Sequence, residues 1–301
     1  MSKKSEKKPP SWLKYPGGKA KIAHLIAERL VPDPAAPHVG SLSFTPYVEC
    51  CVGAGAVLFH MVERFGTRFA PVLLADANPA VRALYRYGVH PVHAATAAEM
   101  PFETLRDKVN QIVRSPMVLA QETKQRELAS YFFVMNRRAM NGLVRCNLDG
   151  EFNAPVGRRQ DGAEHVVTDE MIDAAVARSA LVTSTIRPRV YADCVQCGDA
   201  APQGSLIYAD PPYSGGFTAY SKDGWSTDDD IRLCVALRRA KDERACRVVL
   251  SQPDTEWARS LAAEALPGWT VEALDVGRPI NSDGDGRQPV GELLISSGSP
   301  S

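Results

Sequence analysis

The sequence predicts an α/β fold in which helices cover both faces of a mostly parallel sheet. Three observations predict it. Residues 47–76 contain, in order, an apolar strand, a glycine turn, a helix and a second strand that ends at an acid. The same alternation of strands and helices resumes near Pro188. Between these stretches, residues 97–135 are mostly helical in pattern and highly charged, which indicates an insertion.

The individual elements follow from local patterns. Helices are expected where apolar residues recur at helical spacing, and strands where short apolar runs are bounded by turn residues. Ser226 and the acids after it are typical of a helix N-terminus. The expected helices are 21–31, 56–64, 169–179 and 231–240, and the expected strands are 47–50, 71–75, 206–209 and 247–251.

The last part of the chain completes a doubly wound, Rossmann-like sheet. Residues 271–276 and 290–296 flank a polar loop at 281–286, which predicts a terminal β-hairpin. Residues 136–165 are rich in Asn, Gly and Arg and interrupt regular structure. We therefore expect a disordered basic tail at 1–10, a sheet domain formed by 11–92 and 169–296, an inserted domain at 93–168 and a disordered tail at 297–301, with disorder beginning at Ser296.

Composition limits the function without choosing it. The chain has 301 residues, of which 45% are hydrophobic, so it can bury a sizeable core. Lys plus Arg equals Asp plus Glu at 35 each, and a net charge of zero neither supports nor excludes a nucleic-acid partner. No apolar stretch follows the charged N-terminus and none reaches transmembrane length, so we expect a cytoplasmic protein without a membrane partner.

The seven cysteines are interpreted as ordinary thiols. Their odd number and irregular spacing argue against a secreted disulfide framework. Cys194 and Cys197 form one Cys-x-x-Cys, whereas a zinc site needs about four ligands. Cys50 and Cys51 are adjacent, which is poor ligand geometry, so the sequence predicts no metal site.

The first half of the chain carries the pattern of a nucleotide site. Gly53 and Gly55 lie in a turn after a strand, where glycine lets the backbone approach a ligand closely. Leu58 occupies the position of the third glycine in a dinucleotide-binding turn, which disfavours a nicotinamide cofactor. Asp76 ends the next strand, where an acid accepts hydrogen bonds from ribose hydroxyls. A purely structural turn, with Asp76 in an N-capping turn, is the alternative.

A basic and aromatic segment precedes that turn. Tyr15 and Lys19 flank Gly17-Gly18, and such a segment can fold back over a bound ligand. Tyr15 would then stack on the ligand, and Lys19 would pair with a carboxylate. S-adenosylmethionine carries an α-carboxylate, whereas a nicotinamide dinucleotide does not. A flexible turn without a ligand is the alternative.

Asp210-Pro211-Pro212-Tyr213 follows an apolar strand and is the expected catalytic loop. The two prolines fix the backbone and remove two donors, so the loop presents the Asp210 carboxylate and nearby carbonyls beside the Tyr213 ring. Acceptors and a ring suit a planar base with an exocyclic amine, because acceptors aimed at both amine hydrogens stabilise the charge that develops on nitrogen. A stiff turn closed by a structural Asp is the alternative.

Taken together, these segments resemble the Dam-type, D12-class (α-group) DNA adenine-N6 methyltransferases, in the family's motif order and over almost the whole chain. Residues 13–19, 48–57 and 74–78 are similar to motifs X, I and II. Residues 210–213 are similar to motif IV, and the Phe217 to Tyr220 segment after them also recurs in the family. Residues 136–145 and 150–158 resemble the family's target-recognition hairpin.

The resemblance implies an adenine-specific DNA methyltransferase that uses S-adenosylmethionine, without a metal, on a flipped adenine in double-stranded DNA, most often in GATC. It implies catalytic roles for Asp210, Pro211, Pro212 and Tyr213, and cofactor contacts for Tyr15, Lys19, Glu49, Gly53, Gly55, Asp76 and Asp210. Lys14 and Arg145 match guanine-reading positions, with Arg137, Asn141 and Arg158 also in the DNA-recognition set. Arg137, Arg138, Arg158 and Arg159 are interpreted as phosphate contacts or surface charges. A bacterial or phage-infected cell is the implied setting, and no obligate protein partner is expected.

The chain departs from the family pattern at a few positions. Cys50-Cys51 stands where the family usually has Pro-Phe, and Tyr15 stands where Trp is common. Ala139 and Met140 replace frequent aromatic residues in the recognition hairpin, which bears on the DNA sequence that is read rather than on the reaction. The competing hypotheses are methyl transfer to RNA or to a protein glutamine, and a DNA-binding protein without catalysis.

Overall fold

The computed structural model describes residues 12–15, 17–31, 44–147, 149–214, 224–275 and 291–298. Four segments named above lie outside the described residues: the tail at 1–10, the segment from Phe217 to Tyr220, the polar loop at 281–286 and residues 299–301 of the C-terminal tail.

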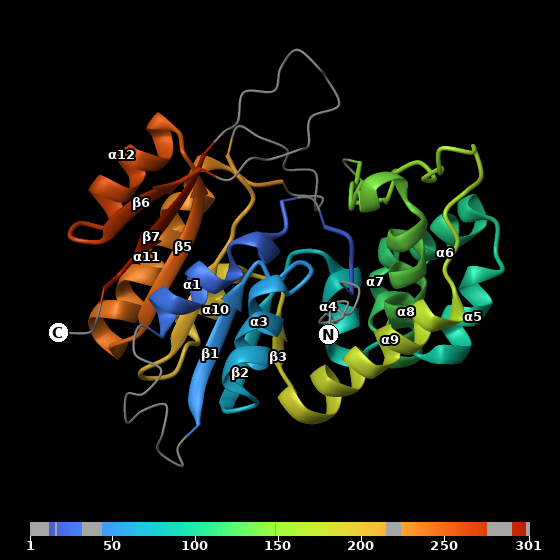
Figure 1. Ribbon diagram of the computed structural model, residues 1–301, viewed down its shortest axis with the longest axis horizontal. Helices are drawn as coiled ribbons and strands as arrows, with labels where there is room; N and C mark the ends of the chain where they lie inside the picture. Colours follow the sequence, from blue (N-terminus) through green and yellow to red (C-terminus); the bar gives the residue numbers. More distant parts are fainter. Residues whose placement is uncertain are drawn as a thin grey trace, which may run out of the picture.

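A seven-stranded sheet forms the centre of one half of the molecule, with the strand order β3-β2-β1-β4-β5-β7-β6 (Figure 1). Neighbouring strands from β3 to β5 are parallel, and β7 is antiparallel to β5 and β6. The antiparallel β6–β7 pair confirms the predicted terminal hairpin. The strands are β1 (Thr45–Cys50), β2 (Phe69–Ala75), β3 (Arg189–Tyr191), β4 (Leu206–Ala209), β5 (Arg247–Pro253), β6 (Thr270–Leu274) and β7 (Glu292–Ser296).

The strand order reverses at β1, and this reversal brings distant segments together. β1 pairs with β2 on one side and with β4 on the other. The Asp210 amide donates to the Cys50 carbonyl at 3.1 Å, which holds the carboxyl ends of β1 and β4 side by side. Ligands of doubly wound proteins bind in the crevice at such a switch point.

Alternating side chains along the central strands bury both faces of the sheet. On β1, Tyr47 belongs to the core that contains α1 and α3, whereas Val48 and Cys50 belong to the core that contains α10, α11 and α12. Strands that are buried on both faces are apolar throughout, and this explains why short apolar runs predicted β1, β2, β4 and β5. The covering helices are α1 (Ala23–Leu30), α3 (Ala56–Phe65), α10 (Cys194–Asp199), α11 (Thr227–Arg244) and α12 (Glu256–Ala265).

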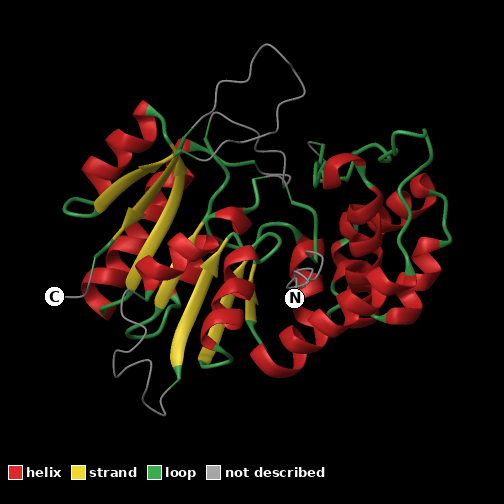
Figure 2. Ribbon diagram, viewed as in Figure 1, coloured by secondary structure: helices red, strands yellow, loops and turns green. Residues whose placement is uncertain are grey.

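The other half of the molecule consists of helices, as Figure 2 shows. One hydrophobic core runs from the sheet into this half and includes Leu84 and Phe132. The division into domains at residues 93 and 168 stays a prediction, since this core is continuous. The helices concerned are α4 (Pro79–Tyr87), which packs against β3 and α8, together with α5 (Pro91–Ala98), α6 (Phe102–Arg114), α7 (Pro116–Leu119), α8 (Glu122–Arg138) and α9 (Asp169–Ala180).

Side-chain caps fix the start of two helices near the crevice. Asn78 Oδ1 accepts from the Ala80 amide at 2.9 Å where α4 begins. Ser226 and Asp229 form a reciprocal capping box, which confirms the predicted N-terminus of α11, although the helix begins at Thr227 and extends to Arg244. The six-residue α10 is too short to give a helical periodicity and has no counterpart among the expected helices. The ten-residue α12 also has no counterpart there.

The prediction of disorder from Ser296 is wrong for Ser296 and Ser297. Ser296 lies in β7 opposite Val249 and Thr270. The Ser297 amide donates to the Val248 carbonyl at 3.0 Å, and the Ser297 hydroxyl accepts from the Val248 amide at 3.0 Å. Pairing with β5 therefore extends order past the apolar part of the strand.

Candidate active site

A buried ion pair joins the expected catalytic loop to the N-terminal segment at the carboxyl edge of the sheet. Lys19 Nζ lies 2.6 Å from Asp210 Oδ1 and 2.8 Å from Asp210 Oδ2, across a separation of 191 positions. Asp210 follows β4, and Lys19 begins a short 3-10 helix (Lys19–Lys21). The two side chains are 7% and 22% exposed, so water and salt screen their attraction only weakly.

Tyr213 and Glu292 complete a cluster around the Lys19 ammonium group. The Tyr213 hydroxyl accepts from Lys19 Nζ at 3.1 Å and donates to Glu292 Oε1 at 2.9 Å. Glu292 Oε1 also lies 3.6 Å from Lys19 Nζ, and its side chain is 2% exposed. Glu292 is not among the predicted site residues; its signal in the sequence is a lone acid at the start of the apolar strand β7.

The cluster favours the charged form of Lys19. Burial by itself would lower the pKa of the Lys19 ammonium group, but Asp210, with Tyr213 and Glu292, raises that pKa above its ordinary value. The ammonium group also donates to the Gly17 carbonyl at 3.2 Å. A permanent cation is therefore held against the Asp210 carboxylate, and this favours the ionised form of the acid.

The glycine turn after β1 adopts a conformation that requires glycine. Gly53 and Gly55 have φ angles of 48° and 68°. A Cβ on Gly53 would lie 3.2 Å from the Tyr15 ring, and one on Gly55 would lie 2.3 Å from the Tyr85 hydroxyl. The Tyr85 hydroxyl donates to the Gly53 carbonyl at 3.1 Å. Tyr15 therefore packs on the turn, as does Tyr85, which the sequence analysis missed.

Asp76 fastens this turn to the start of α4. Its Oδ2 accepts from the Gly53 amide at 2.9 Å, and its Oδ1 accepts from the Asn78 amide at 2.9 Å. Burial raises the pKa of Asp76 to about 6, although the two amides oppose this shift. Each carboxylate oxygen has two acceptor positions, so one bond to each does not saturate the group. The ribose contact of Asp76 stays a prediction beside this turn-holding role.

Glu49 is the last residue but one of β1, and its side chain is 2% exposed. The Tyr47 hydroxyl donates to Glu49 Oε2 at 2.6 Å. Burial raises the pKa of Glu49 to about 8; the charge of Asp210 adds to the shift, and hydrogen bonds from Tyr47 and the Leu58 backbone oppose it. The Glu49 carboxyl group is therefore mostly protonated at neutral pH, and its contact with a cofactor stays a prediction.

Asp230 anchors the chain before and after residues 215–223, which follow the catalytic loop and lie outside the described residues. This residue lies in the first turn of α11 and its side chain is fully buried. Ser214 directly follows Tyr213, so the anchor limits how far the Pro211-Pro212 turn can move. The Asp230 carboxylate accepts from the Ser214 hydroxyl at 2.6 Å, Trp225 Nε1 at 2.8 Å, Gln252 Nε2 at 3.3 Å and Trp257 Nε1 at 3.3 Å.

Lys14 connects the N-terminal segment to the helical half through Asn136. The Lys14 amide donates to Asn136 Oδ1 at 2.9 Å, and the Lys14 carbonyl accepts from Asn136 Nδ2 at 2.8 Å. Asn136 Nδ2 also donates to the Gly142 carbonyl at 3.1 Å. A Cβ on Gly142 would lie 2.0 Å from Lys14 Cβ, so the close approach of the two segments requires glycine. Asn136 thus positions Lys14, a role that the sequence analysis missed.

Two arginines of the recognition segment have local partners. Arg145 Nε donates to Asn153 Oδ1 at 2.7 Å, and Arg145 Nη2 donates to the Asn153 carbonyl at 3.0 Å. Arg158 Nη1 donates to the Gly162 carbonyl at 3.0 Å. Asn141 is exposed and has a left-handed backbone with a φ angle of 53°. Isolated antiparallel bridges fold this stretch of the chain back on itself. The contacts of these residues with DNA stay predictions.

The interpretation of Arg138 as a phosphate contact or surface charge is wrong. Its side chain is buried, and its Nη1 donates to the Met100 carbonyl at 2.6 Å. Its Nη2 lies 3.3 Å from Glu164 Oε2. Because Arg138 is the last residue of α8, this side chain ties the helix end to the segment before α6.

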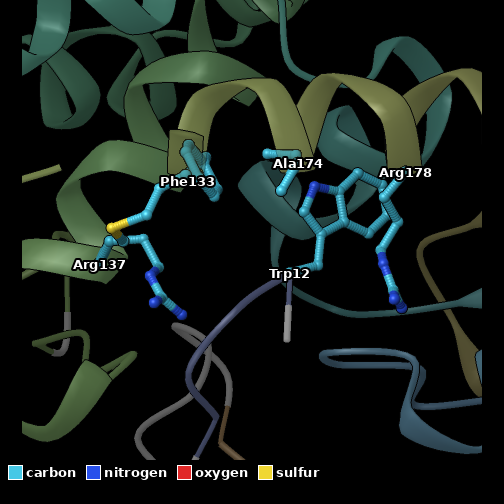
Figure 3. A pocket seen from close by; sticks show the side chains of 7 residues that line it. Trp12, Phe133, Arg137, Ala174 and Arg178 are labelled. Atoms are coloured by element: carbon cyan, nitrogen blue, oxygen red, sulfur yellow. The ribbon is translucent and has the colours of Figure 1, made fainter. Parts of the chain in front are cut away.

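A small hollow separates the N-terminal segment from α8 and α9 (Figure 3). Burial lowers the pKa of Arg137, which lines the hollow. Trp12 Nε1 is buried and has no hydrogen-bond partner among the described residues. The hollow has a volume of about 10 Å³, which accommodates one water molecule and not a nucleoside. Its lining residues are Trp12, Phe133, Arg137, Met171, Ala174, Ala175 and Arg178.

The described ranges also bear on metal sites and membrane spans. No group of three or more His, Cys, Asp or Glu side chains in these ranges is placed to hold a metal ion. No helix in the same part of the chain combines the length and apolar character of a membrane span.

Comparison with known proteins identifies the family. The family model "D12 class N6 adenine-specific DNA methyltransferase" matches residues 15–273. The DNA adenine methylase of Vibrio cholerae is 30% identical over 300 residues and covers 96% of each chain. That of Escherichia coli K12 is 30% identical over 298 residues, covering 96% of this chain and 95% of the relative. The type II methyltransferase M.MjaIII of Methanocaldococcus jannaschii is 26% identical over 316 residues, covering 94% and 97%. The chain belongs to the D12 class of N6 adenine-specific DNA methyltransferases.

Proposed function

We propose that this enzyme transfers the methyl group of S-adenosylmethionine to N6 of an adenine flipped out of double-stranded DNA, with GATC as its preferred site. The observation that carries the proposal is the Lys19–Asp210 ion pair at the switch point of the sheet. The pair joins the loop expected to hold the target amine to the segment expected to contact the cofactor. Membership of an adenine-specific class supports the choice of base.

The residues at this edge fit S-adenosylmethionine. Gly53 and Gly55 give the turn its positive φ angles and leave room for Tyr15 and Tyr85 to pack on it, which shapes the turn that a ligand would approach. Asp76, bonded to the same turn, offers acceptors to ribose hydroxyls. Lys19 offers a cation to the α-carboxylate, and the Tyr15 ring offers an aromatic surface. When bound, the cofactor supplies a methyl group that its sulfonium centre has already activated.

Asp210 is proposed to hold the target amine. The Lys19 cation favours the ionised carboxylate, which accepts hydrogen bonds from the exocyclic amine of adenine. Acceptors aimed at the amine hydrogens favour a pyramidal nitrogen and stabilise the positive charge that develops on it. Pro211 and Pro212 fix the direction of the loop and leave its carbonyls available as further acceptors.

Tyr213 is proposed to stack on the flipped adenine. Its hydroxyl is fixed by Glu292 at 2.9 Å, which restricts the orientation of the ring. Flipping a base costs a few kcal/mol, and stacking on an aromatic ring offsets roughly 1–3 kcal/mol of that cost. The Tyr213–Glu292 contact thus prepares the ring for the base before DNA arrives.

The N-terminal and recognition segments are proposed to read the DNA sequence. Arg145 suits guanine, because its guanidinium group can bond O6 and N7 together. Lys14 lies beside the same segment through Asn136 and is assigned to a guanine as well. Arg137 and Arg158 are assigned to phosphates, which position the duplex without reading it.

Methyl labelling tests the reaction. Purified protein incubated with duplex DNA and S-adenosylmethionine carrying a radioactive methyl group should label the DNA, and digestion should return the label as N6-methyladenine. Sequencing of methylated plasmid should place the modified base in GATC. Label at cytosine, or label confined to RNA or protein, would contradict the proposal.

The Asp210→Ala variant tests the catalytic assignment. We expect transfer to be abolished, while calorimetry still detects weakened cofactor binding, since the glycine turn and Asp76 are intact. Asp199→Ala, which changes a partly exposed acid at the end of α10, should keep the wild-type rate. Wild-type transfer by Asp210→Ala would refute the assignment.

A further inference from the structure

Two buried asparagines hold the segments that carry the proposed guanine readers. Asn136 on α8 and Asn110 on α6 are 1% and 6% exposed. The Asn136 side chain bonds to the Lys14 amide at 2.9 Å and to the Lys14 carbonyl at 2.8 Å. In the same way, the Asn110 side chain bonds to the Phe152 amide at 2.8 Å and to the Phe152 carbonyl at 3.0 Å. Each side-chain amide therefore pairs with one backbone residue as a neighbouring strand would.

The contact of Asn110 leads to Arg145 through Asn153. Asn153 directly follows Phe152 and is exposed. Its amide donates to the Arg145 carbonyl at 3.0 Å, and its Oδ1 and carbonyl accept from Arg145 Nε at 2.7 Å and Nη2 at 3.0 Å. These bonds use the Nε side of the planar guanidinium group and thereby fix its orientation. The Nη1–Nη2 end then presents two further parallel donors, which suit O6 and N7 of a guanine.

The contact of Asn136 fixes Lys14 from both ends. Asn136 Nδ2 also donates to the Gly142 carbonyl at 3.1 Å, so that one side chain holds the N-terminal segment against the recognition segment. Lys14 Nζ donates to the carbonyl of Arg137, the residue after Asn136, at 3.4 Å. The backbone and the ammonium group of Lys14 are thus both held by the last turn of α8.

We propose that the two asparagines are positioning residues that set sequence discrimination separately. Asn136 governs discrimination at the base pair that Lys14 reads, and Asn110 governs it at the base pair that Arg145 reads. The inference rests on the proposed function, which assigns guanines to Lys14 and Arg145. It adds that each reading side chain has its own buried support, although the two supporting helices pack against each other (Figure 1).

Base reading is sensitive to small displacements of the reading group. A hydrogen bond to a base edge needs a distance of about 2.7–3.2 Å between donor and acceptor, so a shift of roughly 0.5 Å weakens recognition. Replacement of either asparagine by alanine leaves a backbone amide and a carbonyl without their partner, and the segment must move to find others. Because the two readers depend on different supports, each replacement should displace one reader more than the other.

Rate measurements on a set of short duplexes test the proposal. Each duplex contains one target adenine in the preferred site, and in all but one of them a single other base pair of the site is replaced. Discrimination at a base pair is the ratio of kcat/KM for the intact duplex to kcat/KM for the duplex altered there. Both values come from the same protein sample, so the fraction of folded protein in a variant does not change the ratio.

The reader variants define the two base pairs. Lys14→Ala should lower discrimination at one base pair, and Arg145→Ala at a different one, by about fivefold or more. Asn136→Ala should lower it by a similar factor at the base pair found with Lys14→Ala, and Asn110→Ala at the one found with Arg145→Ala. At the remaining base pairs, the ratios should stay within about twofold of the wild type.

Ser130→Ala is the matched control. Ser130 is a fully buried polar residue on the same helix as Asn136, and its hydroxyl accepts from the His90 amide at 2.9 Å. This variant loses a buried hydrogen bond whose partner belongs to neither supported segment. Discrimination at every base pair should therefore stay as in the wild type.

Further variants decide the question if the alanine variants do not fold. Asn136→Gln and Asn110→Gln keep an amide in the core but move it by one methylene, so each should lose discrimination at the same base pair as the corresponding alanine variant. Asn153→Ala removes an exposed acceptor of Arg145 and should reproduce the pattern of Asn110→Ala.

The outcomes separate this inference from the proposed function. Asparagine variants that lose discrimination equally at every base pair, or that keep the wild-type ratios, would overturn the inference and leave the reader assignments intact. If Lys14→Ala and Arg145→Ala relax no single base pair, or the wild type labels no DNA, the proposed function is refuted and the inference with it.

Discussion

At the scale of single residues, the site depends on one cation shared among acids. Lys19 bonds to both oxygens of Asp210, and the Tyr213 hydroxyl links it to the buried Glu292. Without this cation, Asp210 would lose the charge partner that favours its ionised form, and Glu292 would lose a positive charge 3.6 Å away. Lys19 is therefore as important for keeping the Asp210 carboxyl group ionised as for any contact with a cofactor.

Replacement of Lys19 should show this dependence. We expect Lys19→Met to lower single-turnover methyl transfer about 100-fold or more, because a protonated Asp210 no longer accepts both amine hydrogens. The residual activity should also rise with pH over a range where the wild type is constant. Lys21→Met, which changes an exposed lysine of the same short helix, should stay within about twofold of the wild type. Equal rates for the two variants would exclude this role.

Glu49 should make stability depend on pH. Its pKa of about 8 in the folded protein lies above the ordinary value of 4.5, so the folded state holds the proton more tightly than the unfolded chain does. The resulting stabilisation is complete below about pH 4.5 and is lost as the pH rises toward 8. We expect the free energy of unfolding to fall by about 4 kcal/mol more in the wild type than in Glu49→Gln between pH 5 and 8.5. Urea titrations of both proteins measure this difference, and parallel pH profiles would contradict it.

At the scale of elements, α11 organises the catalytic side of the sheet through its first turn. Asp230 faces inward and collects donors from the segment after Tyr213, from β5 and from α12. The neighbouring acid Asp228 is exposed and belongs to the charged helix start. Two acids two positions apart in one turn thus serve as an internal anchor and as an exposed charge at the helix start.

Loss of the internal anchor should cost stability. We expect Asp230→Ala to lower the free energy of unfolding by about 3 kcal/mol, because several buried donors lose their acceptor. Asp228→Ala should change it by less than about 1 kcal/mol, since it alters only an exposed helix-start charge. Thermal and urea unfolding of the two variants provide the measurement, and similar losses would show that Asp230 is not a special anchor.

At the scale of the whole molecule, the continuous core predicts that both halves unfold together. Urea unfolding followed by far-ultraviolet circular dichroism, to which the helical half contributes strongly, should coincide with unfolding followed by tryptophan fluorescence. Phe132→Ala, in the shared core, should shift both curves equally. Two separated transitions, or a shift in one curve alone, would indicate independent halves.

The sequence predicts the parts of this site better than their contacts. Apolar runs and turn residues predict β1, β4 and the hairpin, since these patterns are local. The Lys19–Asp210 pair joins residues 191 positions apart, and no local pattern distinguishes it from a contact between Lys19 and a cofactor. The contacts of Glu292 and Asn136 were missed for the same reason. Each of these contacts depends on which strands and helices become neighbours in the fold. A local sequence pattern does not determine that arrangement.

The order of the last strands has a consequence for how the enzyme acquires activity during folding. β6 precedes β7 in the chain but lies outside it in the sheet, and β7 is its strand partner among the described residues. β6 is therefore connected to the sheet only through β7, whose pairing with β5 requires contacts between distant parts of the chain. β7 also delivers Glu292 to the Lys19–Tyr213 cluster. Catalytic competence should thus appear late in refolding, after most helix and sheet content has been recovered.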